Sequence, residues 1–343
     1  MENNWVYTVV IAAFFGLILM TAQHPVHSPS GKIDGVSYVA PPHPTGKKAM
    51  ISVKKVNANW VALTPYAFSK EGSPEVRFDM SRQWWGERKK GLIATIKHAQ
   101  ALGLHVMLKP HVWIHGQGWT GNFELHSEAQ WQKWQKNYQR YIVTYAKIAD
   151  SLGVNLICIG TEFKKAADER PDFWRHLIRK IRSFYHGKLT YAANWDNYRK
   201  IKFWDALDYI GVDAYFPLSK NKMPATTNLE TKWKPVRERL KKFSSQQHKP
   251  ILFTEFGYRS VNYTTDAHWK YKRGERAVNM QAQARAYKAL FETFWHEPWF
   301  AGGFVWKWFD HPRRWHHRHH AKNGYTPQGK PAEQILRHWY GGG

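Results

Sequence analysis

The sequence contains almost no cysteine, and this absence limits how the fold can be stabilised. Cys158 is the one cysteine among 343 residues, so no disulfide within the chain can hold a small or loop-rich fold together. It lies inside the apolar run 156–159, which predicts a small buried hydrophobe rather than a nucleophile or a metal ligand. The chain must depend on a hydrophobic core, and a hydrophobic content of 43% over this length allows one large core or two smaller ones.

Acidic residues are also scarce relative to basic ones. Asp and Glu number 26 against 51 Lys and Arg, which gives a formal net charge of +25 at pH 7. Such a charge favours contact with polyanions, namely nucleic acid, an anionic surface or an acidic polysaccharide. The basic residues are, however, spread over helix-like segments such as 87–90 and 175–182, and no DNA- or RNA-binding motif accompanies them. We therefore expect no nucleic-acid partner, while an anionic glycan stays open as a substrate.

Long hydrophobic runs are absent except at the N-terminus. Residues 5–22 form an apolar stretch without a charged side chain, and its position and length are typical of a signal sequence or a single membrane anchor. A buried N-terminal helix is the third interpretation. We expect residues 1–30 to be a signal or anchor segment with a linker, in which residues 5–22 form the membrane tether if they are retained. Residues 31–343 are expected to be one monomeric domain outside the cytoplasm.

Short β-rich apolar runs alternate with longer amphipathic stretches after residue 30. This alternation is typical of βα units and of a parallel sheet. There are eight such runs, at 35–39, 60–64, 105–109, 156–160, 189–192, 209–212, 251–255 and 303–306. Eight is the number of parallel strands that closes a barrel. The sequence therefore predicts an α/β fold, a TIM (β/α)8 barrel in a single domain.

The stretches between the runs indicate helices and one working face. Between runs three and four, aromatic and apolar side chains recur every three or four residues, which predicts a helix with one buried face: Trp131, Trp134, Tyr138, Tyr141, Tyr145 and Ile148. Links that enter the runs are short, whereas four links that leave them are long, at 110–127, 216–235, 256–275 and 307–329. Barrel enzymes place their sites in the loops at the carboxyl ends of strands. The residues that end each run are therefore the candidates for a site.

Two glutamates end runs on opposite sides of the predicted barrel. Glu162 follows run four and Glu255 ends run seven. Hydrolysis of a glycosidic bond with retention needs two carboxyl groups about 5 to 5.5 Å apart, one to attack the anomeric carbon and one to protonate the leaving oxygen. Trp306 ends run eight, and aromatic rings stack on the C–H faces of sugars. Together these residues indicate a retaining glycosidase.

Five motifs extend this hypothesis to a family. They are Lys109-Pro110-His111, Gly160-Thr161-Glu162, Phe203-Trp204-Asp205, Gly211-Val212-Asp213-Ala214-Tyr215 and Thr254-Glu255-Phe256-Gly257. With these motifs the chain resembles glycoside hydrolase family 113, from about Asp34 to Tyr340. That family belongs to the clan of retaining glycosidases whose catalytic glutamates end barrel strands four and seven, and its known activity is β-mannanase.

The resemblance implies roles for the matching residues. Glu162 would be the general acid and then the base, and Glu255 would be the nucleophile, with Tyr215 hydrogen-bonded to it. Trp306 would be the apolar floor under the sugar ring. Many members of the clan have Asn immediately before the acid/base to bind the 2-hydroxyl of the sugar, whereas this chain has Thr161. This departure leaves the preferred sugar open.

Further strand-end residues are candidate contacts of the sugar or of a carboxylate: Lys109, His111, Asn194, Tyr38 and Trp195. The expected substrate is an oligosaccharide or polysaccharide of β-linked hexoses, with β-mannan as the first choice. The expected chemistry is double displacement through a covalent glycosyl-enzyme, which requires neither a metal nor a cofactor.

Other interpretations use some of the same residues. Lys109 at a strand end could form a Schiff base, as in an aldolase, but this leaves Glu255 and the tryptophans unexplained. A metal hydrolase would draw on several candidate ligands: His111, His115, Asp213 and the run 316–320. A non-catalytic glycan-binding barrel would keep the aromatic residues without needing both glutamates. A glycosidase for an anionic glycan would account for the positive charge.

Overall fold

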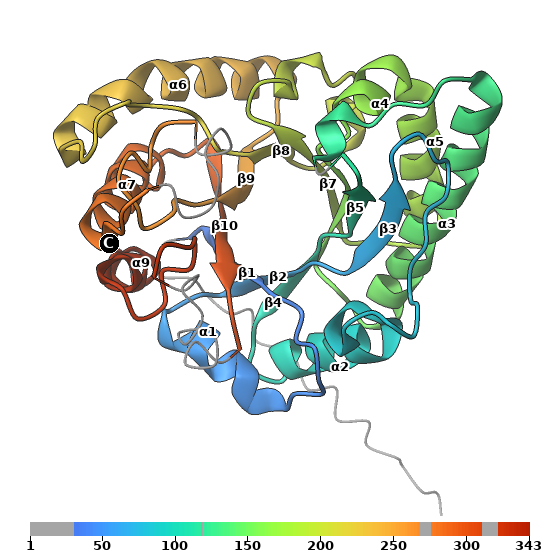
Figure 1. Ribbon diagram of the computed structural model, residues 1–343, viewed down its shortest axis with the longest axis horizontal. Coiled ribbons are helices and arrows are strands. Elements are labelled where there is room, and N and C mark those ends of the chain that lie inside the picture. The colour runs from blue at the N-terminus through green and yellow to red at the C-terminus, as the bar shows by residue number, and fades with distance from the viewer. Residues whose placement is uncertain (1–30, 118, 268–275, 311–321) are drawn as a thin grey trace, which may run out of the picture.

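The barrel consists of eight parallel strands. The computed structural model describes residues 31–343 except residue 118 and the segments 268–275 and 311–321. The strands are β1 (Ile33–Tyr38), β2 (Trp60–Leu63), β4 (His105–Leu108), β6 (Leu156–Thr161), β7 (Lys188–Asn194), β8 (Ile210–Asp213), β9 (Ile251–Phe256) and β10 (Phe300–Trp308). They close in the spatial order β1-β10-β9-β8-β7-β6-β4-β2 (Figure 1). Each strand overlaps one of the eight predicted runs, so the predicted TIM barrel is confirmed.

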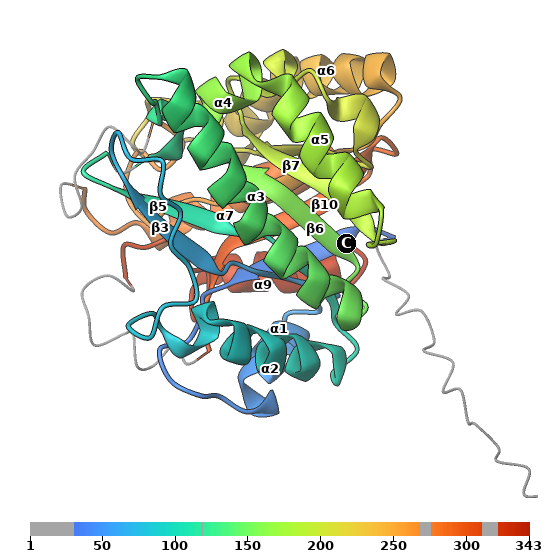
Figure 2. The same cartoon turned by 90° about the vertical axis from the view of Figure 1, so that its right-hand side faces the viewer.

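Helices lie around the outside of the barrel, as Figures 1 and 2 show from two directions. They are α1 (Ile51–Lys55), α2 (Lys89–Gln100), α3 (Glu128–Ser151), α4 (Lys164–Glu169), α5 (Pro171–Arg182), α6 (Thr226–Gln247), α7 (Met280–Phe294) and α9 (Pro331–Tyr340). Short 3-10 helices occur at 47–50, 85–87, 120–122, 198–200 and 204–206. Helix α3 begins after Ser127, whose side chain accepts a hydrogen bond from the N–H of Gln130. Its aromatic stripe faces the strands, with Trp134, Tyr138 and Tyr141 fully buried.

The hydrophobic core has two layers, one inside the barrel and one between the strands and the helices. The inner layer is a cluster of buried side chains: Ile33, Ala62, Met107, Leu156, Cys158, Ala192, Leu252 and Phe304. A glycine is needed at position 35 because a Cβ atom there would lie 2.3 Å from the ring of Phe304. Cys158 is fully buried and free, the small hydrophobe that the sequence predicted. The interior of the barrel is therefore filled by side chains, and a ligand cannot enter it.

A two-stranded ribbon extends the barrel beyond the ends of β2 and β4. It consists of β3 (Tyr66–Lys70) and β5 (His111–His115), which pair in parallel (Figure 2). Pro65 and Pro110 separate these strands from β2 and β4, and because proline has no N–H it interrupts the hydrogen-bonded ladder at this point. The long link predicted at 110–127 therefore contains a strand, β5, that the sequence did not indicate.

Helix α6 also lies partly in a segment predicted as a loop. The predicted loop 216–235 ended at Pro235, a residue that rarely occurs inside a helix. The helix instead begins at Thr226 and includes the proline. The buried side chains of Leu229, Trp233 and Leu240 follow helical spacing and anchor both sides of the interruption.

The predicted N-terminal signal or anchor, residues 1–30, lies outside the described residues, and so does the membrane tether expected at 5–22. Within the described part of the chain, every helix is too short or too polar to cross a lipid bilayer. The boundary between the segment 1–30 and the domain 31–343 stays a prediction.

Candidate active site

Glu255 is surrounded by polar side chains at the mouth of the barrel. It lies on β9 and is only 6% exposed. The amino group of Lys109 is 2.5 Å from Oε1, and the hydroxyl of Tyr215 donates a hydrogen bond of 2.8 Å to Oε2. Nε2 of His111 lies 3.4 Å from Oε1. Both carboxylate oxygens have partners, so the group is held in one orientation.

Lys109 connects β4 to two carboxylates inside the site. Its side chain is fully buried, and its amino group also lies 2.9 Å from Oδ1 of Asp213. The hydroxyl of Thr254 donates a hydrogen bond of 2.7 Å to the same oxygen. Burial alone would lower the pKa of Lys109, but the negative charges of Asp213 and Glu255 outweigh it and raise the pKa above its usual value. Lys109 is therefore a fixed positive charge.

This positive charge keeps Glu255 ionised. Burial would raise the pKa of Glu255, but the charge of Lys109 and the hydrogen bonds from Lys109 and Tyr215 hold it below its usual value. His111 is neutral in contrast, because burial and the neighbouring Lys109 lower its pKa to about 3. Glu255 thus keeps its negative charge across the neutral pH range, as a carboxylate nucleophile must.

Glu162 follows β6 in an unusual backbone conformation. Its φ is +56°, in the left-handed region that favours glycine. The indole N–H of Trp119 donates a hydrogen bond of 2.6 Å to Oε2 of Glu162. Burial, and after it the negative charges of Asp213 and Glu255, together raise the pKa of Glu162 to about 8. At neutral pH Glu162 is therefore mostly protonated.

The two carboxyl groups have opposite protonation states and act on each other. The charge of Glu255 is one cause of the raised pKa of Glu162, so the two groups lie within electrostatic reach. Glycoside hydrolysis requires such a difference, because one carboxylic acid must donate a proton while the other carboxylate attacks. Glu162 therefore has the raised pKa that a proton donor needs, and Glu255 has the lowered pKa that a nucleophile needs.

Trp306 lies on β10, the strand next to β9, which contains Glu255. Its ring stacks on His111, with the ring centroids 5.9 Å apart and the planes inclined by 3°. The peptide bond between Trp306 and Lys307 is cis. The side chain of Trp306 is half-buried, so part of the ring can contact a ligand. An apolar ring in this place suits stacking on a sugar.

The other predicted sugar contacts differ in their surroundings. Asn194 ends β7 and is 9% exposed. Trp195 is half-buried and packs against Phe216, with 5.6 Å between the ring centroids. Tyr38 is 1% exposed and belongs with Val36 to the outer core layer. The structure therefore does not bring Tyr38 to the two carboxyl groups, because alternate residues of β1 share a face and this face points toward the helices.

Two residues of the site had no individual role in a glycosidase assigned to them from the sequence. Trp119 lies 43 positions before Glu162 in the chain, and no spacing rule directs its N–H toward the acid. Asp213 was predicted as part of the family motif 211–215 and as a metal ligand in an alternative interpretation, not as a partner of Lys109. Its pairing with Lys109 follows from opposite charges at two strand ends, a signal that the sequence contains.

The surroundings of Lys109 and of the histidines also concern the two alternative chemistries, a Schiff-base aldolase and a metal hydrolase. A Schiff-base lysine needs an unprotonated amine, whereas Lys109 is held in its protonated form between two carboxylates. Across the described residues, no three His, Cys, Asp or Glu side chains converge as metal ligands. His115 instead stacks on Phe68, with 6.0 Å between the ring centroids. The histidine-rich run 316–320 lies outside the described residues.

Glycoside hydrolases include barrels that hold a neutral carboxylic acid and an ionised carboxylate at the carboxyl ends of two strands, and this chain has that fold and such a pair. The model of Glycoside Hydrolase Family 113 matches residues 42–330. The chain belongs to this family, as its motifs predicted. No match was found among curated proteins.

Solved structures of family 113 are similar over nearly the whole chain. The β-mannanase AaManA from Alicyclobacillus acidocaldarius is 27% identical with a TM-score of 0.78, over 90% of this chain and 97% of that one. A β-1,4-mannanase of the same family is 27% identical with a TM-score of 0.75, over 90% of this chain and 98% of that one. The β-glucuronidase from Ruminococcus gnavus, 11% identical with a TM-score of 0.59 over half of its length, shares only the fold.

Proposed function

We propose that this protein hydrolyses β-linked hexosyl polysaccharides, with β-mannan as its main substrate, by double displacement. The proposal rests on the difference in pKa between two carboxyl groups: the pKa of Glu162 is raised to about 8, and the pKa of Glu255 is lowered. A barrel that only binds glycans would not need two carboxyl groups with such different pKa values. The preference for mannan is supported by the β-mannanases that share 27% identity and nearly full length with this chain.

In the first step the ionised Glu255 attacks the anomeric carbon, and the bond to the leaving oxygen breaks. Glu162 gives its proton to that oxygen, so the leaving sugar departs as an alcohol. The product on the enzyme is an ester between Glu255 and the sugar. Lys109 stabilises the carboxylate before attack without donating a proton, since its pKa is raised.

In the second step Glu162 changes from acid to base. The negative charge of Glu255 disappears when the ester forms, and with it one cause of the raised pKa of Glu162. The ionised Glu162 can then remove a proton from water, which attacks the anomeric carbon and releases Glu255. Two inversions return the original anomeric configuration.

We further propose that the enzyme acts as a monomer outside the cytoplasm. A polysaccharide is too large to cross a membrane unaided, so a polymer-degrading enzyme must be exported to reach it. The apolar residues 5–22 would provide the export signal or a membrane tether. Membrane fractionation of cells that express the full chain distinguishes the tether from a cleaved signal.

Hydrolysis of β-mannan by the purified protein tests the proposed substrate and stereochemistry. We expect mannan to release oligosaccharides faster than cellulose, xylan or an acidic polysaccharide, measured as reducing ends and by mass spectrometry. Proton NMR during the first turnovers should detect the β-anomer before mutarotation, because double displacement retains configuration. A first product with the α-anomer contradicts the mechanism, and faster cleavage of another polysaccharide contradicts the substrate.

The pH dependence of kcat/KM is expected to be bell-shaped. On the acid side, activity falls as Glu255 takes up a proton, below the usual carboxyl pKa of 4.5. On the alkaline side, activity falls near pH 8 as Glu162 loses its proton. Initial rates from about pH 3 to about pH 10 on an unactivated oligosaccharide measure both limbs. An alkaline limb below pH 6, with the protein still folded, contradicts the role of Glu162.

A further inference from the structure

We propose that the β3–β5 ribbon is a second sugar-binding surface, along which the polysaccharide continues from the catalytic centre into a pocket beside β3. This inference rests on the proposed glycosidase activity and deepens it, because it identifies where the chain is held away from the cleaved bond. Three observations support it: a row of accessible side chains, the contact of that row with the catalytic residues, and the pocket at its outer end.

On the β3–β5 ribbon, the accessible side chains lie on one face and the buried side chains lie on the other. The side chains that are exposed or half-buried form three facing pairs: Tyr66 with His111, Phe68 with Trp113, and Lys70 with His115. The side chains between them are all buried: Ala67, Ser69, Val112 and Ile114. Alternate residues of a strand share a face, so the three pairs form a single row. Successive pairs lie about 6 to 7 Å apart along the strands.

The inner pair of this row belongs to the catalytic centre. Nε2 of His111 lies 3.4 Å from Oε1 of Glu255, and its ring stacks on Trp306. The ring of Tyr66 is 5.2 Å from that of His111 between centroids. A sugar stacked on Trp306 would therefore have the first pair beside it. Further sugars of the same chain can follow the row outward.

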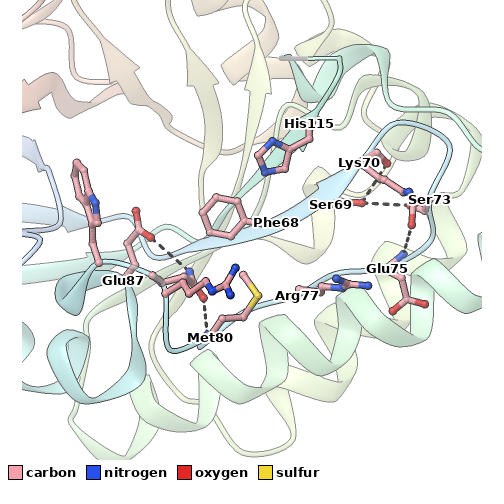
Figure 3. A pocket seen from close by; sticks show the side chains of 12 residues that line it. Phe68, Ser69, Lys70, Ser73, Glu75, Arg77, Met80, Glu87 and His115 are labelled. Atoms are coloured by element: carbon pink, nitrogen blue, oxygen red, sulfur yellow. Dashed lines mark hydrogen bonds between the residues drawn. The ribbon is translucent and has the colours of Figure 1, made fainter.

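The outer part of the row opens into a pocket of about 570 Å³. Figure 3 shows Phe68 and His115 on the ribbon side of this pocket, with Met80 and Arg77 across from them. The rings of Phe68 and His115 are stacked, with their planes inclined by 24°. The pocket and the row share these two rings, so the surface is continuous from the nucleophile to the pocket.

The side chains along this surface suit a sugar chain. Trp113 on the ribbon is 47% exposed and Trp84 in the pocket wall is 42% exposed. Leaving this much indole in water loses the stabilisation that burial gives. Trp113 is the strand partner of Phe68, and Trp84 lines the same pocket as Phe68, so apolar surface is exposed along the row and in the pocket. Arg77 and Arg82 add hydrogen-bond donors to the pocket and Glu87 adds an acceptor. Flat rings for C–H faces together with directional polar groups for hydroxyls are what carbohydrates require.

The test compares a long and a short substrate in Trp113→Ala and Phe68→Ala. With mannan we expect KM to rise about tenfold while kcat changes by less than about twofold. With an aryl β-mannoside, which occupies only the cleaved position, both constants should stay within about twofold of the wild type. Phe184→Ala is the control, because it removes a half-buried ring before β7, at the opposite end of the barrel. It should leave the ratio between the two substrates unchanged.

Binding without turnover separates this inference from the proposed function. Glu255→Ala should be retarded by mannan in affinity electrophoresis, and Glu255→Ala combined with Trp113→Ala should be retarded less. Equal losses on long and short substrates would overturn the inference, because the ring would then only support the catalytic centre. Unchanged KM on the polymer together with unchanged retardation would also overturn it. Failure of the proposed function has a different signature, namely a wild type that does not cleave mannan at all.

Discussion

Replacing Glu255 by alanine is expected to lower kcat/KM on mannan by about 10⁴-fold or more. The reason is that, in the proposed mechanism, this carboxylate alone attacks the anomeric carbon. Lys109 and Tyr215 orient it and keep it ionised, but a fully buried ammonium group and a phenol cannot replace it as the nucleophile. Reducing-end assays of purified wild type and variant measure the loss, with unfolding temperatures to verify that the variant folds.

A small anion gives this variant a second readout. Alanine leaves space beside the anomeric carbon, and azide supplied with an activated aryl β-glycoside can attack there once. The expected product is the α-glycosyl azide, because a single displacement inverts configuration. If azide instead yields the β-azide, or if Glu255→Ala keeps more than about one tenth of wild-type activity, another group is the nucleophile.

Replacing Glu162 by alanine is expected to affect substrates according to their leaving groups. With mannan, kcat/KM should fall by about 10² to 10⁴-fold, because the departing sugar needs the proton. With an aryl β-glycoside that has a good leaving group, the first step should be nearly normal and the glycosyl-enzyme should accumulate. Azide should then release the β-glycosyl azide, since it attacks an intermediate that has already been inverted once.

Glu297 is the matched control for this experiment. Its Oε2 accepts a hydrogen bond of 2.6 Å from the indole N–H of Trp299, the same kind of bond that Trp119 makes to Glu162. It lies between α7 and β10, at the end of the barrel where strands begin. Glu297→Ala should leave both substrates and the alkaline limb of the pH profile unchanged. Equal losses of Glu162→Ala on good and poor leaving groups would contradict the role of the acid.

The barrel could be predicted because its strands are short, apolar and separated by amphipathic helices. Those features are local, and eight repeats of them leave little choice of topology. The ribbon was missed because β3 and β5 follow β2 and β4 with only a proline-containing step between them. Their pairing depends on two segments far apart in the chain meeting above the rim. The predicted link extended to Pro235, although helix α6 begins at Thr226, because the proline was given more weight than the apolar residues at helical spacing around it.

The part of the site that lies at the carboxyl ends of strands could be predicted from the sequence. Lys109, Asp213 and Glu255 meet because parallel strands bring their carboxyl ends to one rim. Tyr38 failed this rule, since a strand alternates its faces and a shift by one residue moves a side chain from the rim to the outer core. Trp119 lies in a loop, where no periodicity fixes the direction of a side chain. Strand ends can therefore be read from the sequence, whereas loop contributions need coordinates.

The backbone at position 162 prefers a residue that cannot perform the chemistry. A φ of +56° in a non-glycine residue costs about 1 to 2 kcal/mol, and glycine would recover that free energy. Glycine, however, has no side chain from which to give a proton. Selection for thermal stability would therefore favour glycine at position 162, whereas selection for catalysis requires glutamate. Gains in thermal stability must come from other positions of the barrel.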